Sequence, residues 1–319
     1  MTDLSETIAL KLRKEAARLG FAAIGFSRPA AQTQAMERFE RMLGDRRHGE
    51  MHYLETAKEK RDKPEMLLQG LGTIISAAVS YNHALRLPEG VPIIARYALT
   101  TDYHTVVRKK LEELGEFLKT LIDGPVRTAV CVDSGPVLEK TWAEYAGIGR
   151  TGKNTLLIVP SAGSYLFLGE LFIDREIGTP KPRLPYPCGG CSACIENCPS
   201  GALLEAGKID ARKCISYLTI ELKREFTSEE AEAIGCNLFG CDRCQEVCPW
   251  NLQASVPADS AFALKKQLLG ISPETILDLG KSGFRELFYG TPVFRIGLGR
   301  LKRNARAVAG NLGKTAGSD

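Results

Sequence analysis

The sequence lacks the features of a membrane or secreted protein. No stretch approaches the roughly 18 consecutive apolar residues that mark a transmembrane helix, so we expect no association with a membrane. The start, Met1 to Glu6, is polar and acidic, unlike a signal peptide or an Arg-rich transit peptide. We therefore expect a cytoplasmic protein, and such a chain is not expected to carry a disulfide scaffold.

Low-complexity segments are also missing, and the only repeat is a pair of cysteine runs. The 319 residues are 44% hydrophobic and 25% charged, which predicts a soluble globular protein of about two domains. The formal net charge of +4 is unevenly spread. Residues 251–319 hold ten Lys and Arg against five Asp and Glu, a net charge of +5, so the rest of the chain sums to −1. The sequence thus has a nearly neutral body and a basic tail.

Residues 1–178 mix helical and strand patterns. Helices are expected at residues 4–19, 32–43, 103–121 and 137–146. Strands are expected at residues 21–26, 73–81, 93–98, 127–132, 155–159 and 165–173, the last two as a hairpin. Because the strands mostly lack regular intervening helices, the pattern predicts an α+β fold rather than a doubly wound sheet.

A proline-rich segment, residues 179–187, marks a domain boundary. Its four prolines in nine residues exclude a helix or a central strand. We therefore divide the chain into residues 1–178, a cysteine module at 179–255 and a short, basic, helical segment at 256–319.

The first cysteine run has the spacing of a bacterial ferredoxin. It reads Cys188-x2-Cys191-x2-Cys194-x3-Cys198-Pro199. In such a run three thiolates hold one [4Fe–4S] cluster, and the fourth ligates the other cluster of a two-cluster module. The run therefore predicts a second one.

The second run reads Cys241-x2-Cys244-x3-Cys248-Pro249, with Leu238 where a first cysteine would stand. Zinc modules also use Cys-x2-Cys pairs, but two runs of this form are typical of iron–sulfur clusters. Two clusters in one small module indicate electron transfer.

The crossing rule assigns most of the cysteines. The first cluster takes Cys188, Cys191, Cys194 and Cys248, and the second takes Cys198, Cys241, Cys244 and one more. Cys214, in an expected helix over 211–218, and Cys236 compete for the last place, with spacing favouring Cys214. Cys131, in an apolar strand, is expected to be a packed core thiol.

Two other patterns in the first part were considered as ligand sites. Gly147-x-Gly149-x-x-Gly152 fits a nucleotide-binding fingerprint, but a helix precedes it and a strand follows, which is the reverse of the required order. The four histidines are scattered. The electron acceptor is therefore expected to be an organic or corrin cofactor.

The chain resembles the epoxyqueuosine reductase family over nearly its whole length. The resemblance lies in both cysteine runs, with the second read as Phe239 to Asn251, and in the segments 95–98, 102–104, 132–139 and 151–157. It implies a cobalamin-binding α/β sandwich-like domain, a ferredoxin-like domain with two [4Fe–4S] clusters and a short helical segment. The implied reaction reduces epoxyqueuosine at the wobble position of tRNA to queuosine. An external low-potential electron donor is implied, and a monomer is expected.

The resemblance also implies residue roles. It places Cys214 on the second cluster, leaving Cys236 as a spare thiol. It makes Asp133 the proton donor, with a raised pKa in a pocket capped by the corrin. The candidates for corrin contacts are Arg96, Tyr97, His104, Asp133, Lys153, Asn154 and Thr155.

The basic tail is expected to contact tRNA phosphates. Its candidate residues are Arg295, Arg300, Lys302, Arg303 and Arg306. Many family members continue into a helical-repeat domain after this point, whereas this sequence stops soon after the first such helix. The alternatives are another corrinoid reductase, such as a reductive dehalogenase, which shares the cofactors, and an electron carrier without catalytic activity.

Overall fold

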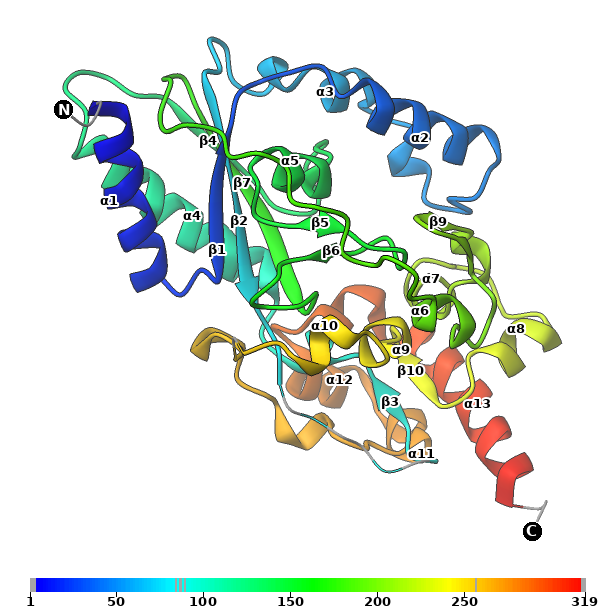
Figure 1. Ribbon diagram of the computed structural model, residues 1–319. Helices are drawn as coiled ribbons and strands as arrows, with labels where there is room; N and C mark the ends of the chain where they lie inside the picture. The colour runs from blue at the N-terminus through cyan, green and yellow to red at the C-terminus, as the bar shows by residue number, and fades with distance from the viewer. Residues whose placement is uncertain (1–3, 84, 86–87, 89, 256, 317–319) are drawn as a thin grey trace.

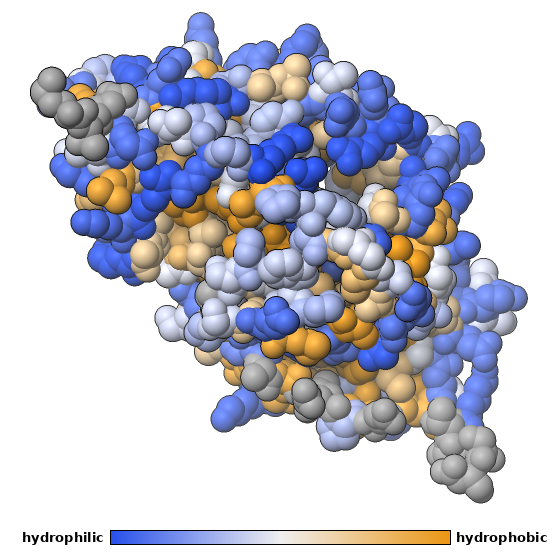
Figure 2. Space-filling view, in the orientation of Figure 1, coloured by the Kyte–Doolittle hydropathy of each residue, from blue (hydrophilic) through white to orange (hydrophobic). Residues whose placement is uncertain are grey.

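The computed structural model describes residues 4–83, 85, 88, 90–255 and 257–316. The first and last described helices lie at opposite ends of the molecule (Figure 1). Hydrophilic residues cover much of the face in view, and hydrophobic residues gather near its middle and lower parts (Figure 2). Within these ranges no helix combines the length and apolar character needed to cross a bilayer.

A four-stranded sheet forms the centre of the first part of the chain (Figure 1). Its order is β1 (Ala23–Ser27), β2 (Thr73–Ser80), β7 (Leu166–Ile173) and β4 (Thr128–Cys131), and every neighbouring pair is antiparallel. Every residue of β2 is buried. Its continuous run of small and apolar residues fits a strand that is covered on both faces.

Helices cover both faces of this sheet. α1 (Leu4–Arg18) and α4 (Tyr103–Lys119) pack on one face, and α5 (Glu139–Tyr145) packs on the other. α4 begins where the Asp102 side chain accepts a hydrogen bond from the backbone N–H of His104 (3.0 Å), an N-cap that satisfies a free helix donor. The capped end of α4 therefore carries His104 close to the end of the sheet.

An arm of short helices extends from β1 toward the cysteine module (Figure 1). It contains α2 (Thr33–Gly44), η1 (His52–Leu54), α3 (Lys58–Asp62) and η2 (Pro64–Met66). The backbone N–H of Glu50 donates to the Tyr217 hydroxyl (2.8 Å), and the Arg47 guanidinium donates to the carbonyl oxygen of Ile209 (3.0 Å). These contacts anchor the arm on the module.

The cysteine module consists of short elements. They are α6 (Ala193–Glu196), β8 (Leu203–Glu205), β9 (Lys208–Ile209), η4 (Ala211–Lys213), α7 (Ile215–Ile220), α8 (Ser228–Ala233), β10 (Asn237–Phe239), α9 (Arg243–Glu246) and α10 (Pro249–Leu252). β8 and β9 form an antiparallel pair. The cysteines occupy the turns and the ends of these elements, so their thiols can converge without belonging to a regular sheet.

Helices of the C-terminal part pack on the cysteine module. They are η5 (Ser260–Phe262), η6 (Lys266–Leu268), α11 (Pro273–Asp278), α12 (Lys281–Phe288), η7 (Pro292–Ile296) and α13 (Gly297–Ala316). Leu301, Ala305 and Val308 of α13 lie in one apolar core with Leu218 and Leu238 of the module.

The first part of the chain also joins this core. β3 (Ile93–Ile94) pairs in parallel with β10, and the 3₁₀ helix η3 (Arg96–Leu99) places Ala98 and Leu99 among the buried residues. The division at residues 178 and 255 stays a prediction, and the packing across these positions is extensive.

The structure confirms the expected mixture of helices and strands and the helical C-terminus, and it corrects three local predictions. β6 (Leu157–Ile158) pairs with β5 (Arg150–Thr151) rather than forming a hairpin with β7, because β7 lies between β2 and β4. The strand predicted over residues 93–98 ends at Ile94, where η3 takes over. Residues 211–218 do not form one helix, because Cys214 is extended between η4 and α7.

Candidate active site and cluster cavities

Four cysteines of the two runs line one cavity of about 160 Å³. They are Cys188, Cys191, Cys194 and Cys248. Cys188 accepts a hydrogen bond from the backbone N–H of Lys153 (3.3 Å), the kind of N–H···S contact that stabilises a thiolate ligand. The set is the one that the crossing rule predicts for the first cluster, and thiolates are the donors that such clusters use.

The other cysteines of the runs lie close to Cys214. Burial, with the neighbouring Asp242, Cys214 and Cys198 and against the backbone N–H of Arg243, raises the pKa of Cys241 to about 12. Burial also raises the pKa of Cys244, with Cys241 and Cys214 adding to the effect. These four thiols form a second group, in which Cys198 acts on Cys214 and Cys241, and both of these act on Cys244.

Cys236 lies apart from this group. Burial alone raises its pKa, whereas the charge of Cys198 acts on Cys214. These electrostatic contacts favour Cys214 over Cys236 as the remaining thiol of the second group.

A larger cavity, of about 440 Å³, opens beside the end of the sheet. Its wall includes the aromatic rings of Tyr81, Tyr97, Tyr103 and Phe167 and the carboxyl group of Asp133. Apolar residues of β7 and of the segment before α5 complete the wall. A large group with flat apolar faces and a polar rim suits such a cavity.

Asp133 lies on the turn between β4 and α5. Its φ of 51° places a non-glycine residue in the left-handed region, a conformation that costs energy and needs support from its surroundings. The backbone N–H of Asp133 donates to Oε1 of Glu139 (2.6 Å). The turn is thereby fixed, and Asp133 and Glu139 both line the cavity.

Two side chains of α4 hold the carboxyl group of Asp133. The Tyr103 hydroxyl donates to Oδ2 (2.8 Å), and Nε2 of His104 lies 2.9 Å from the same oxygen. The Tyr103 ring stacks on His104 and on Phe167, with ring centroids 4.1 Å and 4.3 Å apart. The stacking fixes both hydrogen-bonding groups around Asp133.

His104 lies between two carboxylates. Its Nδ1 is 2.7 Å from Oδ1 of Asp102, and its Nε2 contacts Asp133. Burial lowers the pKa of His104, but the hydrogen bonds to Asp102 and Asp133 outweigh burial and raise it to about 9. The raised pKa favours the protonated form of His104, in which each ring nitrogen donates to one carboxylate, while the Arg295 guanidinium, 2.9 Å from Nδ1, opposes this form.

The hydrogen bond with His104 has the opposite effect on the pKa of Asp133. Burial raises the pKa of Asp133, but the hydrogen bonds from His104 and Tyr103 outweigh it, so the pKa lies below its usual range. This corrects the expected raised pKa. In this arrangement the proton resides on His104, 2.9 Å from the carboxyl group that faces the cavity.

Comparison with known proteins identifies the family. The family model "Epoxyqueuosine reductase QueG, DUF1730" matches residues 61–134, and the model "4Fe-4S double cluster binding domain" matches residues 187–251. The epoxyqueuosine reductase of Cellulophaga algicola is 36% identical over 293 residues, which cover 92% of this chain and 95% of that protein. The chain belongs to the epoxyqueuosine reductase family. It is thus an oxidoreductase, and the family resemblance inferred from the sequence is confirmed.

Other epoxyqueuosine reductases agree. The Pseudomonas aeruginosa protein is 37% identical over 315 residues, which cover 97% of this chain and 86% of that protein. A crystal structure of an epoxyqueuosine reductase with an epoxyqueuosine-modified tRNA-Tyr stem loop matches with a TM-score of 0.89 at 28% identity, covering 97% of this chain and 83% of that chain. The Streptococcus thermophilus enzyme matches with a TM-score of 0.87 at 31% identity, covering 96% of this chain and 82% of that chain.

The residues expected to contact the corrin fall into separate places. Tyr97 and Asp133 line the larger cavity, with His104 directly behind Asp133. Lys153 and Asn154 line the cluster cavity instead. Thr155 accepts a hydrogen bond from Nζ of Lys140, another residue of the larger cavity, through its carbonyl oxygen (2.9 Å).

Arg96 connects the two parts of the chain. Its guanidinium donates to the carbonyl oxygens of His83 and Leu85 and lies over the Tyr165 ring. Its backbone N–H donates to the buried carboxyl group of Asp242 (2.7 Å), inside the second cysteine run. These contacts occupy Arg96 outside the wall of the larger cavity.

The five basic residues of the tail also differ from one another. Arg306 is exposed and Lys302 is partly exposed, and Arg295 lies beside the active site, with its guanidinium 2.9 Å from Nδ1 of His104. Arg300 donates to the carbonyl oxygens of Ile296 and Ile220.

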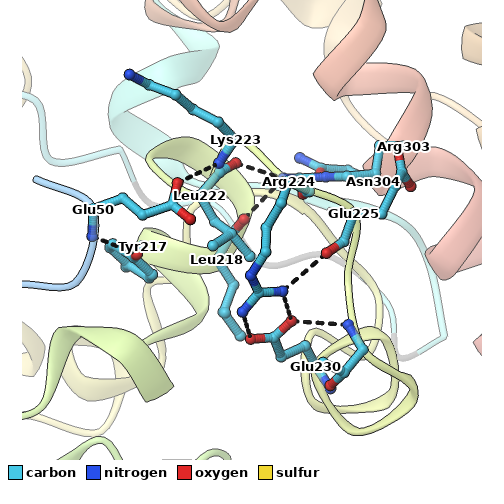
Figure 3. Close-up of polar contacts among 11 residues, drawn as sticks. Glu50, Tyr217, Leu218, Leu222, Lys223, Arg224, Glu225, Glu230, Arg303 and Asn304 are labelled. Carbon is cyan, nitrogen blue, oxygen red and sulfur yellow. Dashed lines mark hydrogen bonds and ion pairs between the residues drawn. The ribbon is translucent and has the colours of Figure 1, made fainter.

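Arg303 requires a correction. It is buried, and its guanidinium donates to the carbonyl oxygens of Leu218, Leu222 and Arg224 (Figure 3). The expected phosphate contact is wrong for Arg303, because packing and hydrogen bonds within the protein occupy this side chain.

Sequence reasoning missed several residues of the site. Tyr103 and Asp102 stand in the quoted segment 102–104, and Glu139 ends the quoted segment 132–139. Their positions in motifs shared with the family were the available signal. Glu170, a charged residue inside the apolar strand β7, was a signal by itself.

Proposed function

We propose that this chain reduces the epoxide of epoxyqueuosine in tRNA to give queuosine. The observation that carries the proposal is the Asp133 carboxyl group, which faces a large cavity and is held by Tyr103 and protonated His104. Removing an epoxide oxygen as water takes two electrons and two protons. The site provides the protons, and the cysteine module provides the route for the electrons.

Two [4Fe–4S] clusters fit the thiol groups of the module. We assign Cys188, Cys191, Cys194 and Cys248 to the first cluster and Cys198, Cys214, Cys241 and Cys244 to the second. The N–H of Lys153 toward Cys188 suits a thiolate ligand. An external low-potential donor would deliver the electrons to these clusters.

We assign the larger cavity to cobalamin, in a sandwich-like domain formed by residues 1–178. The wide aromatic and apolar wall fits the faces of a corrin ring, and polar groups at the rim fit its amides. Tyr97, His104 and Asp133 are the expected neighbours, with Lys153, Asn154 and Thr155 on the side of the clusters. Bound cobalamin would supply a strongly nucleophilic reduced metal centre.

The chain's own residues move the proton. His104 holds it at Nε2, within 2.9 Å of Oδ2 of Asp133, and Tyr103 orients the same oxygen. Asp133 passes this proton to the oxygen that leaves carbon. A Bacillus subtilis epoxyqueuosine reductase, which matches with a TM-score of 0.82 at 29% identity, has a catalytic loop swung out of its active site. The strained turn at Asp133 is the corresponding mobile element that we propose here.

A tRNA partner follows from the crystallised relative with a modified tRNA stem loop. Arg295 beside the cavity, with Arg300, Lys302 and Arg306 on or near α13, offers positive charge to the phosphates. We propose that the enzyme works in the cytoplasm, where a tRNA substrate would be met, and that it acts as a monomer. A reductive dehalogenase activity is not favoured, because the relatives at 36–37% identity are epoxyqueuosine reductases.

Nucleoside analysis of tRNA tests the substrate. Cells lacking the gene should accumulate epoxyqueuosine and lose queuosine, and the wild-type gene should reverse the change. Unchanged queuosine would reject the proposal.

In purified enzyme, Asp133→Asn should abolish turnover while cobalamin and iron stay bound. Ser134→Ala, on the same turn, is the matched control and should remain active.

A further inference from the structure

Two more carboxyl groups lie on the elements next to Asp133. Glu139 opens α5, and Glu170 lies on β7, the strand against which α5 packs. The proton transfer from His104 through Asp133 uses neither of them. The reaction nevertheless consumes two protons, and that transfer accounts for one.

Glu139 shares the larger cavity with Asp133. Its Oε1 accepts the hydrogen bond from the backbone N–H of Asp133 (2.6 Å). A neutral carboxyl group can accept such a bond with one oxygen while the other oxygen carries a proton. The contact that fixes the Asp133 turn is therefore compatible with a protonated Glu139 at the cavity wall.

Glu170 is enclosed in the sheet. It lies opposite Ser76 of β2 and Cys131 of β4, and it is 0% exposed. Within the described part of the chain, neither carboxyl oxygen of Glu170 has a hydrogen-bond partner, and Ser76 Oγ and Trp142 Nε1 nearby also have none. An ionised carboxylate cannot be sustained there, so Glu170 is a neutral acid.

The surroundings shift the pKa values of the two carboxyl groups at the cavity, Glu139 and Asp133, in opposite directions. Burial, followed by the charge of Asp133, raises the pKa of Glu139 to about 8, against the lowering effects of the Asp133 N–H, Lys140 and His104. Asp133 is ionised at neutral pH, as its lowered pKa shows. Two neighbouring acids with opposite shifts are the usual arrangement for separate roles in proton transfer.

We propose that Glu139 supplies the second proton of the reduction, with Glu170 as the neutral acid behind it. This rests on the proposed epoxide reduction. The first proton passes from His104 through Asp133 to the epoxide oxygen as one C–O bond breaks. The second passes from Glu139 to the resulting hydroxyl group, which leaves as water as the other C–O bond breaks and the alkene forms. Two electrons from the external donor complete the balance, and solvent returns both protons.

Glu170 limits the electrostatic cost of removing the proton from Glu139. Burial raises the pKa of Glu170 well above its usual range, and the charge of Glu139 raises it further. Glu170 therefore stays neutral when Glu139 loses its proton, and so does Cys131, whose pKa burial raises to about 12. The new carboxylate at Glu139 meets no second negative charge from the sheet.

Glu139→Gln tests the proposal in the enzyme loaded with both cofactors, with epoxyqueuosine-modified tRNA stem loop as substrate. Glutamine keeps an acceptor for the Asp133 N–H but cannot act as the acid. We expect the rate to fall by about 10²- to 10⁴-fold. The wild-type rate should decline as pH rises through about 8, whereas the variant should keep only the decline through about 9 that His104 sets. Glu144→Gln, on the same helix and also accepting a backbone N–H (2.8 Å, from Thr151), is the matched control and should keep the wild-type profile.

The comparison with Glu139→Ala separates proton supply from positioning. If Glu139→Gln is as active as wild type and only Glu139→Ala is impaired, Glu139 merely holds the turn and the proposal is overturned. An active Asp133→Asn would instead contradict the proposed function, whatever Glu139 does.

Infrared spectroscopy gives a readout without turnover, because a protonated Glu139 should show a carboxylic acid band that disappears above pH about 8. Glu170→Gln identifies the separate, pH-independent band of Glu170, and the absence of both bands in wild type would overturn the proposal.

Discussion

The guanidinium group of Arg303 donates a hydrogen bond to the carbonyl oxygen of Leu218 (2.9 Å), near the end of α7. It also reaches the carbonyl oxygens of Leu222 and Arg224 (Figure 3). Asn304 beside it donates to the carbonyl oxygen of Thr219 (2.8 Å). Carbonyls at a helix end have no partner within the helix, so the donors to Leu218 and Thr219 complete the end of α7, and the other two bonds hold the segment that follows it. Cys214 is the N-cap residue at the opposite end of α7. A residue of the last helix thus secures the helix that presents a proposed cluster ligand.

Arg303→Met should destabilise the fold. The substitution leaves the carbonyl groups of Leu218, Leu222 and Arg224 without their donor, the first two in buried contacts, and we expect the free energy of unfolding to fall by about 2–4 kcal/mol. Denaturant unfolding followed by circular dichroism measures the change. Arg306→Met, at an exposed position of the same helix, should change stability by less than about 0.5 kcal/mol. Equal effects of the two substitutions would show that Arg303 does not secure α7.

Cys214 and Cys236 should respond differently to replacement by serine. Cys214→Ser removes a proposed ligand of the second cluster, so anaerobically purified protein should lose about four of about eight irons. Cys236→Ser should keep the full iron content. Iron and acid-labile sulfide analysis measures both, and the reverse result would move the ligand assignment to Cys236.

His104 should make the stability of the fold depend on pH. Its pKa is raised from 6.5 to about 9 in the folded protein, so the protonated form stabilises the fold. This contribution is fully present below pH about 6.5 and is lost as pH rises through about 9. It amounts to about 3 kcal/mol at most. The difference in unfolding free energy between wild type and His104→Gln should shrink over this range, and a constant difference would contradict the assignment.

Arg306 should contribute to tRNA binding through charge alone. Arg306→Gln should weaken binding of a tRNA stem loop and reduce the slope of log affinity against log salt by about 1. Lys14→Gln, an exposed position of α1 far from α13, serves as the control (Figure 1). An unchanged salt slope for Arg306→Gln would remove this residue from the proposed tRNA surface.

Local spacing was enough to predict the cluster module. The two runs specify their own turns, so Cys188, Cys191, Cys194 and Cys248 could be grouped from the sequence, and the structure places them around one cavity. The predicted hairpin was wrong because strand pairing depends on distant partners, and β7 pairs with β2 and β4.

Side-chain surroundings were harder to predict than elements. Arg303 belongs to a basic run that reads as a solvated surface, yet α13 turns this residue toward α7. The pKa of Asp133 was expected to be raised because burial was foreseen and the hydrogen bonds from His104 and Tyr103 were not. Both errors concern contacts between elements far apart in the sequence.

The parallel pairing of β3 with β10 has a consequence for how the protein folds during its synthesis. The ribosome releases β3 long before β10, so Ile93 and Ile94 stay unpaired with β10 while most of the cysteine module is translated. The Arg96–Asp242 contact forms later still. The domain with the larger cavity and the cysteine module therefore complete their folding together, so cluster insertion is coupled to the final stage of folding. Either half expressed separately should be a poor source of native protein.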